Sequence, residues 1–88
     1  MYAIAATLYK MITGVNPPEV TNRIYELGSS RKDILIPLSE YSKKIKHNQE
    51  TVILNALNVS VKNRTKDMKT LLYELTTDKP VKRIRNKI

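Results

Sequence analysis

The sequence contains no cysteine, no tryptophan and no phenylalanine, and each absence excludes a class of protein. Without cysteine the chain can form no disulfide framework, no thiolate metal site and no thiol nucleophile. Five tyrosines are the only aromatic residues, so the core has to be built from Ile, Leu, Val, Met and Ala. With 88 residues the chain is at most one small domain, near the size at which a single core is only marginally stable.

Glycine and histidine are nearly as scarce. The two glycines, Gly14 and Gly28, lie too far apart to form a G-x-G phosphate-binding loop. His47 and Glu50 have two interpretations. They could be half of a metal site or an acid–base pair, or they could be a helix-start residue beside an acid in the first turn. The second interpretation is favoured, because one histidine without cysteine cannot build a zinc site. We therefore expect no catalytic, cofactor-binding or metal-binding residue in this chain.

The net charge of +8 is concentrated at the C-terminal end of the chain. Residues 79–88 contain no acid and five bases, which are candidate anion-binding residues: Lys79, Lys82, Arg83, Arg85 and Lys87. As a solvated terminus this basic tail needs no further role, and this interpretation is favoured. As a juxtamembrane segment it would gain about 1 kcal/mol per base near an anionic membrane surface. Nucleic-acid binding is the least favoured, since the tail has no aromatic side chain for base stacking.

The first stretch, 1–14 (MYAIAATLYKMITG), predicts a helix that is apolar nearly all round. Only Thr7, Lys10 and Thr13 interrupt the apolar surface. Such a helix is normally buried, and about 13 residues are too few to cross a bilayer, which needs roughly 20. We therefore predict that it is the central core helix, closed at its end by Gly14.

Three further amphipathic stretches predict an all-α fold of about four helices. Asn16 is the expected cap of the second helix, which Gly28 ends, and Thr65 is the expected cap of the fourth. Between them, Ile34 to Ile36 predicts an extended segment laid across the core. The helices are expected at 1–14, 18–27, 48–58 and 65–76, with a single helical turn near 39–42. Val59 and Val61 are expected to point inward. One domain is expected over 1–78, followed by a disordered basic tail over 79–88.

Four parts of the chain resemble protein kinases, one of them being Met68 and Leu72, which fall where helix I of a kinase buries its first residues. Residues 2–14 (YAIAATLYKMITG), with Pro17 and Pro18, resemble the segment D-x-Y-S-L-G-x-x-L-Y-E-L-L-T-G-x-x-P-P, which forms helix F of the kinase C-terminal lobe. Residues 54–65 (LNALNVSVKNRT) look like the end of helix H and the loop before helix I. Residues 37–40 (PLSE) are similar to a linker of bacterial serine/threonine kinases.

This resemblance, which spans about residues 1–76, implies a partial C-terminal lobe of a bacterial-type serine/threonine kinase, helices F to I. It implies that the first helix anchors a catalytic loop and that 18–27 offers a docking surface. It also implies that Arg64 pairs with the glutamate that closes an activation segment, and that Met68 and Leu72 are buried. Ser60 and Val61 depart from the usual Asp-Pro, and neither that glutamate nor the aspartate expected before Tyr2 is in this chain.

Phosphoryl transfer needs a glycine-rich loop, a lysine, a base and carboxylates for Mg²⁺. Because the chain has no G-x-G, H-R-D or D-F-G, we expect a non-catalytic cytoplasmic scaffold or docking piece, with ATP and Mg²⁺ needed only by a full-length parent. Its expected partner is the missing N-terminal part of the kinase domain. The alternative is a small basic α-helical module whose tail binds nucleic acid or an anionic membrane, the latter at the inner face of the membrane.

The resemblance also implies that the first helix has lost the segments that cover it in a whole lobe. We therefore expect self-association through an exposed apolar patch. The patch residues are expected among Tyr2, Ile4, Leu8, Tyr9 and Met11, and the interaction residues are Arg64, Tyr2, Tyr9 and Leu8.

Overall fold

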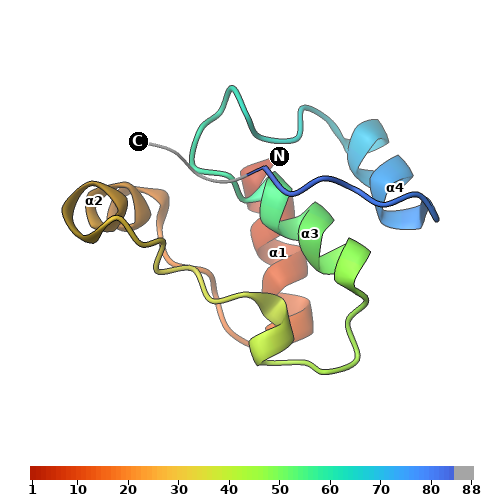
Figure 1. Ribbon diagram of the computed structural model, residues 1–88, viewed down its shortest axis with the longest axis horizontal. Helices are drawn as coiled ribbons and strands as arrows, with labels where there is room; N and C mark the ends of the chain where they lie inside the picture. Colours follow the sequence, from red (N-terminus) through yellow and green to blue (C-terminus); the bar gives the residue numbers. More distant parts are fainter. Residues whose placement is uncertain (85–88) are drawn as a thin grey trace.

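The computed structural model describes residues 1–84, which form four α-helices and one short 3-10 helix, without a strand (Figure 1). These elements are α1 (Tyr2–Thr13), α2 (Val20–Ser30), η1 (Leu38–Glu40), α3 (His47–Ala56) and α4 (Met68–Thr76). The prediction of an all-α fold with about four helices is confirmed. Within this part of the chain, each helix is too short or too polar to cross a membrane.

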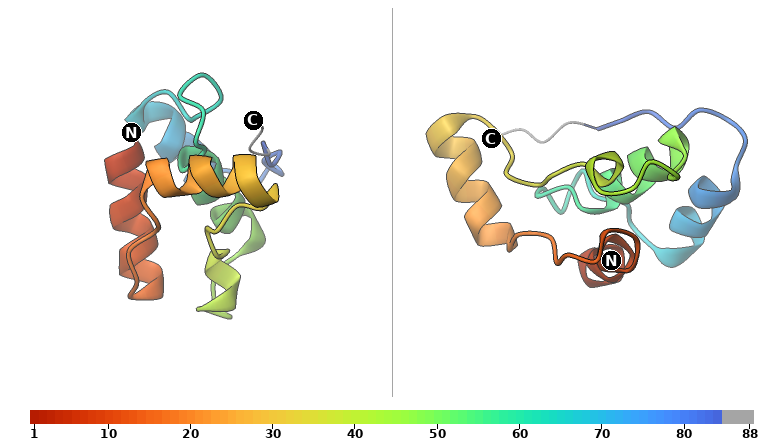
Figure 2. Two further views of the ribbon diagram at one scale, coloured as in Figure 1. Left: turned by 90° about the vertical axis from the view of Figure 1, so that its left-hand side faces the viewer. Right: turned by 90° about the horizontal axis from the view of Figure 1, so that it is seen from below.

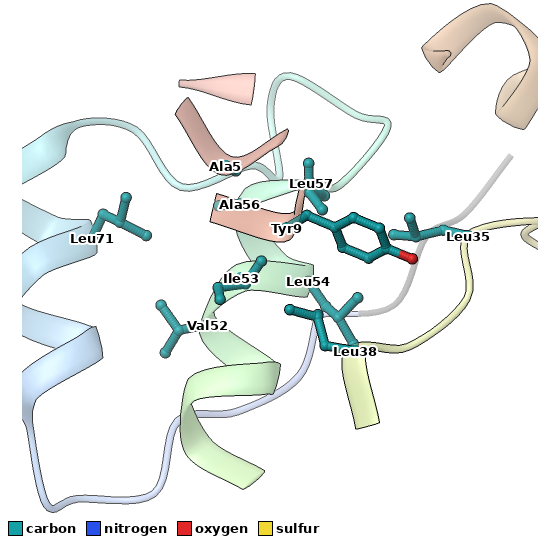
Figure 3. Packing of buried hydrophobic residues seen from close by; sticks show 10 residues of the cluster. All are labelled: Ala5, Tyr9, Leu35, Leu38, Val52, Ile53, Leu54, Ala56, Leu57 and Leu71. Carbon is teal, nitrogen blue, oxygen red and sulfur yellow. The ribbon is translucent and has the colours of Figure 1, made fainter. Parts of the chain in front are cut away.

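The central helix is α3. Every residue from Thr51 to Val59 is buried, and α3 packs against both α1 and α4. Figure 2 shows α3 between α1 on one side and the C-terminal residues 79–84 on the other. The core gathers around it (Figure 3) and consists of Ala5, Tyr9, Leu35, Leu38, Val52, Ile53, Leu54, Ala56, Leu57 and Leu71.

The prediction that the first helix is central was therefore wrong. Only Ala5 and Tyr9 are buried in α1, whereas Met11 is 75% exposed. An all-round apolar surface favours burial only where other elements can surround it. Within residues 1–84, α1 is covered on the side of α3 and η1, while α3 has neighbours on opposite sides.

The predicted end of the first helix is confirmed. Gly14 adopts the left-handed conformation (φ 79°) and its N–H donates to the carbonyl of Lys10 at 2.7 Å. This conformation is accessible to glycine because it has no Cβ. Tyr9 then anchors residues 32–37, which we call the middle segment, to α1. Its hydroxyl donates to the carbonyl of Ile36 at 2.6 Å, and the centres of the Tyr9 and Tyr41 rings lie 6.4 Å apart in an edge-to-face contact.

The second helix lies later than predicted. It begins at Val20 after the N-cap residue Glu19, so Asn16 does not cap it. A proline disfavours the helical conformation of the residue before it, and Pro18 follows Pro17. Gly28 does not end the helix, which continues to Ser30, and the C-cap residue Arg31 takes the left-handed conformation (φ 61°).

The fourth helix begins at Met68, and its cap is Asp67, whose carboxylate accepts the N–H of Thr70 at 2.8 Å. Thr65 was the wrong cap. The buried face is also narrower than predicted: Leu71 is buried, but Met68 and Leu72 are exposed.

The connecting segments are partly as predicted. Residues 32–37 are neither helix nor strand, and Leu35 is buried among them. The single turn forms as η1, which starts one residue earlier than predicted. Val59 is buried, as expected, whereas Val61, which lies in the turn that the carbonyl of Ser60 closes, is 77% exposed.

Candidate functional site

The outer face of α1 carries apolar side chains that are exposed in the part of the chain that the structure describes. Ile4, Thr7 and Met11 follow one another at helical spacing and are exposed. A surface hollow of about 370 Å³ adjoins Thr7 and Met11. Leu8 lies half-buried at the edge of this face, and Tyr9 is buried, so Tyr9 was wrongly placed in the patch.

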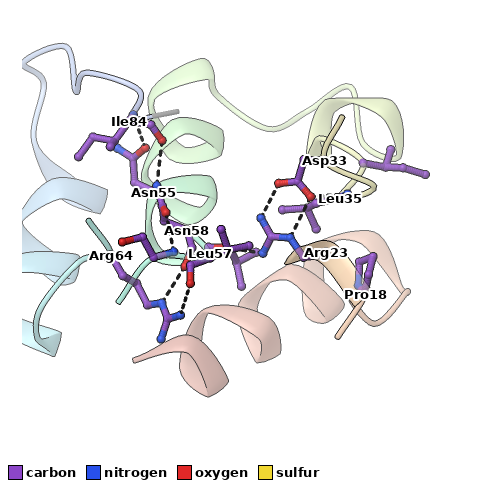
Figure 4. Close-up of polar contacts among 12 residues, drawn as sticks. Pro18, Arg23, Asp33, Leu35, Asn55, Leu57, Asn58, Arg64 and Ile84 are labelled. Carbon is purple, nitrogen blue, oxygen red and sulfur yellow. Dashed lines mark hydrogen bonds and ion pairs between the residues drawn. The ribbon is translucent and has the colours of Figure 1, made fainter. Parts of the chain in front are cut away.

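Two of the predicted interaction residues, Tyr2 and Arg64, lie together. The Arg64 guanidinium carbon is 5.0 Å from the centre of the Tyr2 ring, within the range of a cation–π contact. Its Nε–H donates to the carbonyl of Asn58 at 2.8 Å (Figure 4). Tyr2 donates its hydroxyl hydrogen to the carbonyl of Pro18. Arg64 thus fixes the loop before α4 against the start of α1.

A second arginine, Arg23, was missed by the sequence reasoning and is fully buried. Its Nε and Nη2 donate to the two carboxylate oxygens of Asp33 at 2.9 and 2.6 Å (Figure 4). Its Nη1 donates to the Tyr2 hydroxyl at 3.1 Å and to the carbonyl of Leu57. We call Arg23, Asp33, Tyr2 and Leu57 the arginine cluster, and it joins α2, the middle segment, α1 and the end of α3.

The sequence did contain a signal for this cluster. Arg23 lies three residues after Val20 and four before Leu27, on the same helical face. The apolar neighbour Ile24 is exposed, whereas Leu27 is buried. A charged residue amid a buried stripe indicates a buried ion pair.

The charges of the arginine cluster stabilise each other. Burial by itself lowers the pKa of Arg23, but the hydrogen bonds to Asp33 and Tyr2 outweigh it and raise that pKa above its ordinary value. Burial likewise raises the pKa of Asp33, but the Arg23 guanidinium and the N–H of Leu35 lower it overall. Both groups are therefore charged at neutral pH.

Residues 79–84, which we call the strap, were predicted to belong to a disordered tail and instead lie along α3 (Figure 1). Asn48 and Asn55 hold the strap through side-chain amides that both donate to its carbonyl groups and accept from its N–H groups. The docked strap leaves Lys79 and Lys82 exposed. Arg83 is half-buried and donates to the side-chain oxygen of Asn55 at 3.2 Å. The predicted anion-binding residues Arg85 and Lys87 lie outside the described residues.

The structure also places the residues considered for metal or acid–base chemistry. His47 is exposed, and the carboxylate of Glu50 accepts the N–H of Ser39 at 2.6 Å. Among residues 1–84 there is no group of three or more His, Cys, Asp or Glu side chains that could hold a metal ion. Comparisons of the chain with models of protein families, with curated proteins and with solved structures found no match.

Proposed function

We propose that this chain is a non-catalytic part of the C-terminal lobe of a serine/threonine-kinase-like protein, and that it acts as a docking scaffold. The observation that carries the proposal is the outer face of α1, where Ile4 and Met11 are exposed. An uncovered apolar face of this kind is typical of a protein contact surface. Its occupant would be the part of a kinase domain that holds the catalytic loop and activation segment.

The positions of the segments that resemble kinases support this proposal. The helix F-like residues form α1, and the helix H-like residues form the end of α3, which packs on α1. Arg64, the counterpart of the arginine that faces an activation segment, lies beside Tyr2 at the start of α1. This contact places Arg64 at the start of the helix whose outer face is the proposed docking surface.

A binding experiment tests the docking role. The partner is a bacterial serine/threonine kinase segment that runs from the N-terminal lobe through the activation segment. We expect it to bind the chain and to bind the Ile4→Glu/Met11→Glu variant at least about tenfold more weakly, because each substitution places a charge in an apolar contact. Titration calorimetry measures both affinities.

The matched control is Leu72→Glu/Tyr73→Glu, which adds the same two charges to exposed positions of α4. It should leave the affinity unchanged. No binding by the unmodified chain, or equal weakening by both variants, would contradict docking through α1. Saturable binding of Mg-ATP to the chain alone would contradict its non-catalytic character.

A second candidate function is the binding of an anionic surface by the strap, favoured by the exposure of Lys79 and Lys82. Electrostatic binding of this kind weakens steeply as salt rises. We expect Lys79→Gln/Lys82→Gln to reduce binding to vesicles that contain phosphatidylserine, measured by co-sedimentation at low and high salt. Binding that depends neither on salt nor on these lysines would exclude this candidate.

A further inference from the structure

The strap is held by two asparagine side chains that repeat the same pattern. Asn48 donates its Nδ2–H to the carbonyl of Lys79 at 2.9 Å and accepts the N–H of Val81 at 2.8 Å. Asn55 does the same with the carbonyl of Lys82 at 2.9 Å and the N–H of Ile84 at 2.8 Å. Each amide thus pairs with the carbonyl of one residue and the N–H of the residue two positions later, as a neighbouring strand would.

We call each of these paired sets of hydrogen bonds, one at Asn48 and one at Asn55, a rung. The distance between the two rungs follows from the geometry of a helix and an extended chain. Asn48 and Asn55 lie seven residues apart, which is roughly 10.5 Å along a helix. Their partners in the strap lie three residues apart, which is roughly 10 Å along an extended chain. The two repeats match, so both amides can pair at once. Asn58 adds a further bond, from its Nδ2–H to the carbonyl of Ile84 at 3.2 Å (Figure 4).

Most hydrogen bonds between the asparagines and the strap involve the main chain of the strap, so they depend little on its side chains. An N–H is required at residues 81 and 84, which excludes proline there, while Pro80 occupies a position where no N–H is used. Of the strap's side chains, Val81 packs against the core cluster and Arg83 donates to the side-chain oxygen of Asn55. The groove therefore fits an extended segment with an aliphatic residue at position 81.

We propose that the asparagine face of α3 is a peptide-binding groove, that the strap is its ligand within the same chain, and that the strap of a second copy can take its place. A second copy carries the same main-chain pattern and the same valine, so its strap makes the same contacts. Attachment to the same chain gives the strap an effective concentration of about millimolar, which favours the closed form. Exchange becomes dominant when this intramolecular contact is weakened. The proposal is independent of the kinase-like origin.

Two full-length variants test the exchange by complementation. Val81→Asp weakens the strap, because it places a carboxylate against the core, and leaves the groove intact. Asn48→Leu removes both hydrogen-bonding atoms of one rung with little change in volume and leaves the strap intact. We expect labelled Val81→Asp chain to bind unlabelled Asn48→Leu chain in fluorescence anisotropy. The binding should be at least about tenfold tighter than that of labelled Val81→Asp to the Asn48→Leu/Val81→Asp double variant, which offers only the damaged strap.

All three chains keep the outer face of α1, so association through that face contributes equally to both measurements. Equal binding of the single and double variants would overturn the exchange. Circular dichroism first establishes that each variant retains its helices. Should Val81→Asp fail to fold, Lys79→Gly/Pro80→Gly weakens the strap by flexibility and replaces it.

Hydrogen exchange in the unmodified chain tests the groove without any substitution. The amide protons of Val81 and Ile84 donate to asparagine side chains, and the amide of Lys82 between them serves as the reference. We expect the amides of Val81 and Ile84 to exchange at least about tenfold more slowly than that of Lys82. Equal exchange of the three amides would show that the asparagine hydrogen bonds to the strap do not form.

Discussion

Arg23 is buried on α2, and at the scale of single residues it has the largest structural consequence. A guanidinium can be buried only when its donors and its charge are satisfied. Asp33 supplies the counter-charge and accepts two hydrogen bonds, one on each carboxylate oxygen. The Tyr2 hydroxyl and the carbonyl of Leu57 accept the other hydrogen bonds of the guanidinium. Because these partners come from three other segments, the arginine cluster fixes the position of α2, which otherwise stands apart from the other helices (Figure 1).

We expect Asp33→Asn to destabilise the chain by about 3 kcal/mol, because it leaves the charge of buried Arg23 without a counter-charge. Urea unfolding at neutral pH measures the difference in the free energy of unfolding. Glu26→Gln is the control, since it removes the same charge from α2 at a residue with no assigned ion pair. A comparable loss from both substitutions would show that Asp33 acts only through the net charge.

The same ion pair predicts a loss of stability in acid. Folding lowers the pKa of Asp33, so its contribution is fully present above the ordinary carboxyl pKa of about 4. It is lost as the pH falls below this value through the lower pKa of the folded state. The Asp33→Asn variant should show a shallower decline between about pH 4 and pH 2 in thermal unfolding. Parallel curves for the two proteins would contradict the pairing.

Tyr9 predicts a change at the opposite end of the pH scale. Burial, and secondarily Tyr41, raise the pKa of Tyr9 to about 12. Since the folded state favours the neutral phenol, its contribution is present below the ordinary tyrosine pKa of about 10 and is lost as the pH rises toward 12. We expect a late step in the phenolate absorbance near pH 12 that is absent from Tyr9→Phe. A late step of full size in that variant would assign it to another tyrosine.

At the scale of helices, the two glycines have opposite roles. Gly14 ends α1 with a positive φ, whereas Gly28 lies inside α2 with ordinary helical geometry. A side chain at either position would meet no atom within 4 Å, so backbone conformation alone decides the effect of a substitution.

We therefore expect Gly14→Ala to lower the free energy of unfolding by about 1 kcal/mol, and Gly28→Ala to raise it by about 0.5–1 kcal/mol. Each variant adds one methyl group to an open position, so each controls for the other. Chemical denaturation measures both. Changes of the same sign would contradict the assigned end of α1 or the continuation of α2 through Gly28.

At the scale of the whole molecule, the charge and the apolar outer face of α1 act against each other. The chain carries a net charge of +8, which opposes contact between copies, while Ile4 and Met11 favour it. Salt screens the charge within a Debye length of about 8 Å at physiological ionic strength and leaves the apolar contact in place.

We expect the chain to self-associate more strongly at 0.5 M than at about 0.05 M salt, in sedimentation equilibrium, because the repulsion is screened. Ile4→Glu/Met11→Glu should abolish this association, although it lowers the net charge. Leu72→Glu/Tyr73→Glu changes the charge equally and should not abolish it. A monomer at all salt concentrations would exclude self-association through α1.

The sequence by itself determined the features that depend on near neighbours in the chain. Helical periodicity predicted four helices, and the glycine after Thr13 marked the end of the first. The alternation of apolar and polar residues is read over a single turn or two, so these features need no knowledge of distant contacts. The cap of the fourth helix was predicted wrongly, because Thr65 and Asp67 are both residue types that cap helices and the backbone conformation decides which of them accepts an N–H of the first turn.

Only the tertiary structure decided which helix is central and which polar residues are buried. The partners of the asparagine amides lie about 30 residues away in the chain, and those of Arg23 lie 10, 21 and 34 residues away. Such partners have no local signature, because an asparagine or arginine is typical of the surface until a specific acceptor reaches it. The strap forms hydrogen bonds with the side-chain amides of Asn48 and Asn55 and covers the side of α3 that faces away from α1. For this reason α3 rather than α1 is the central helix of the fold.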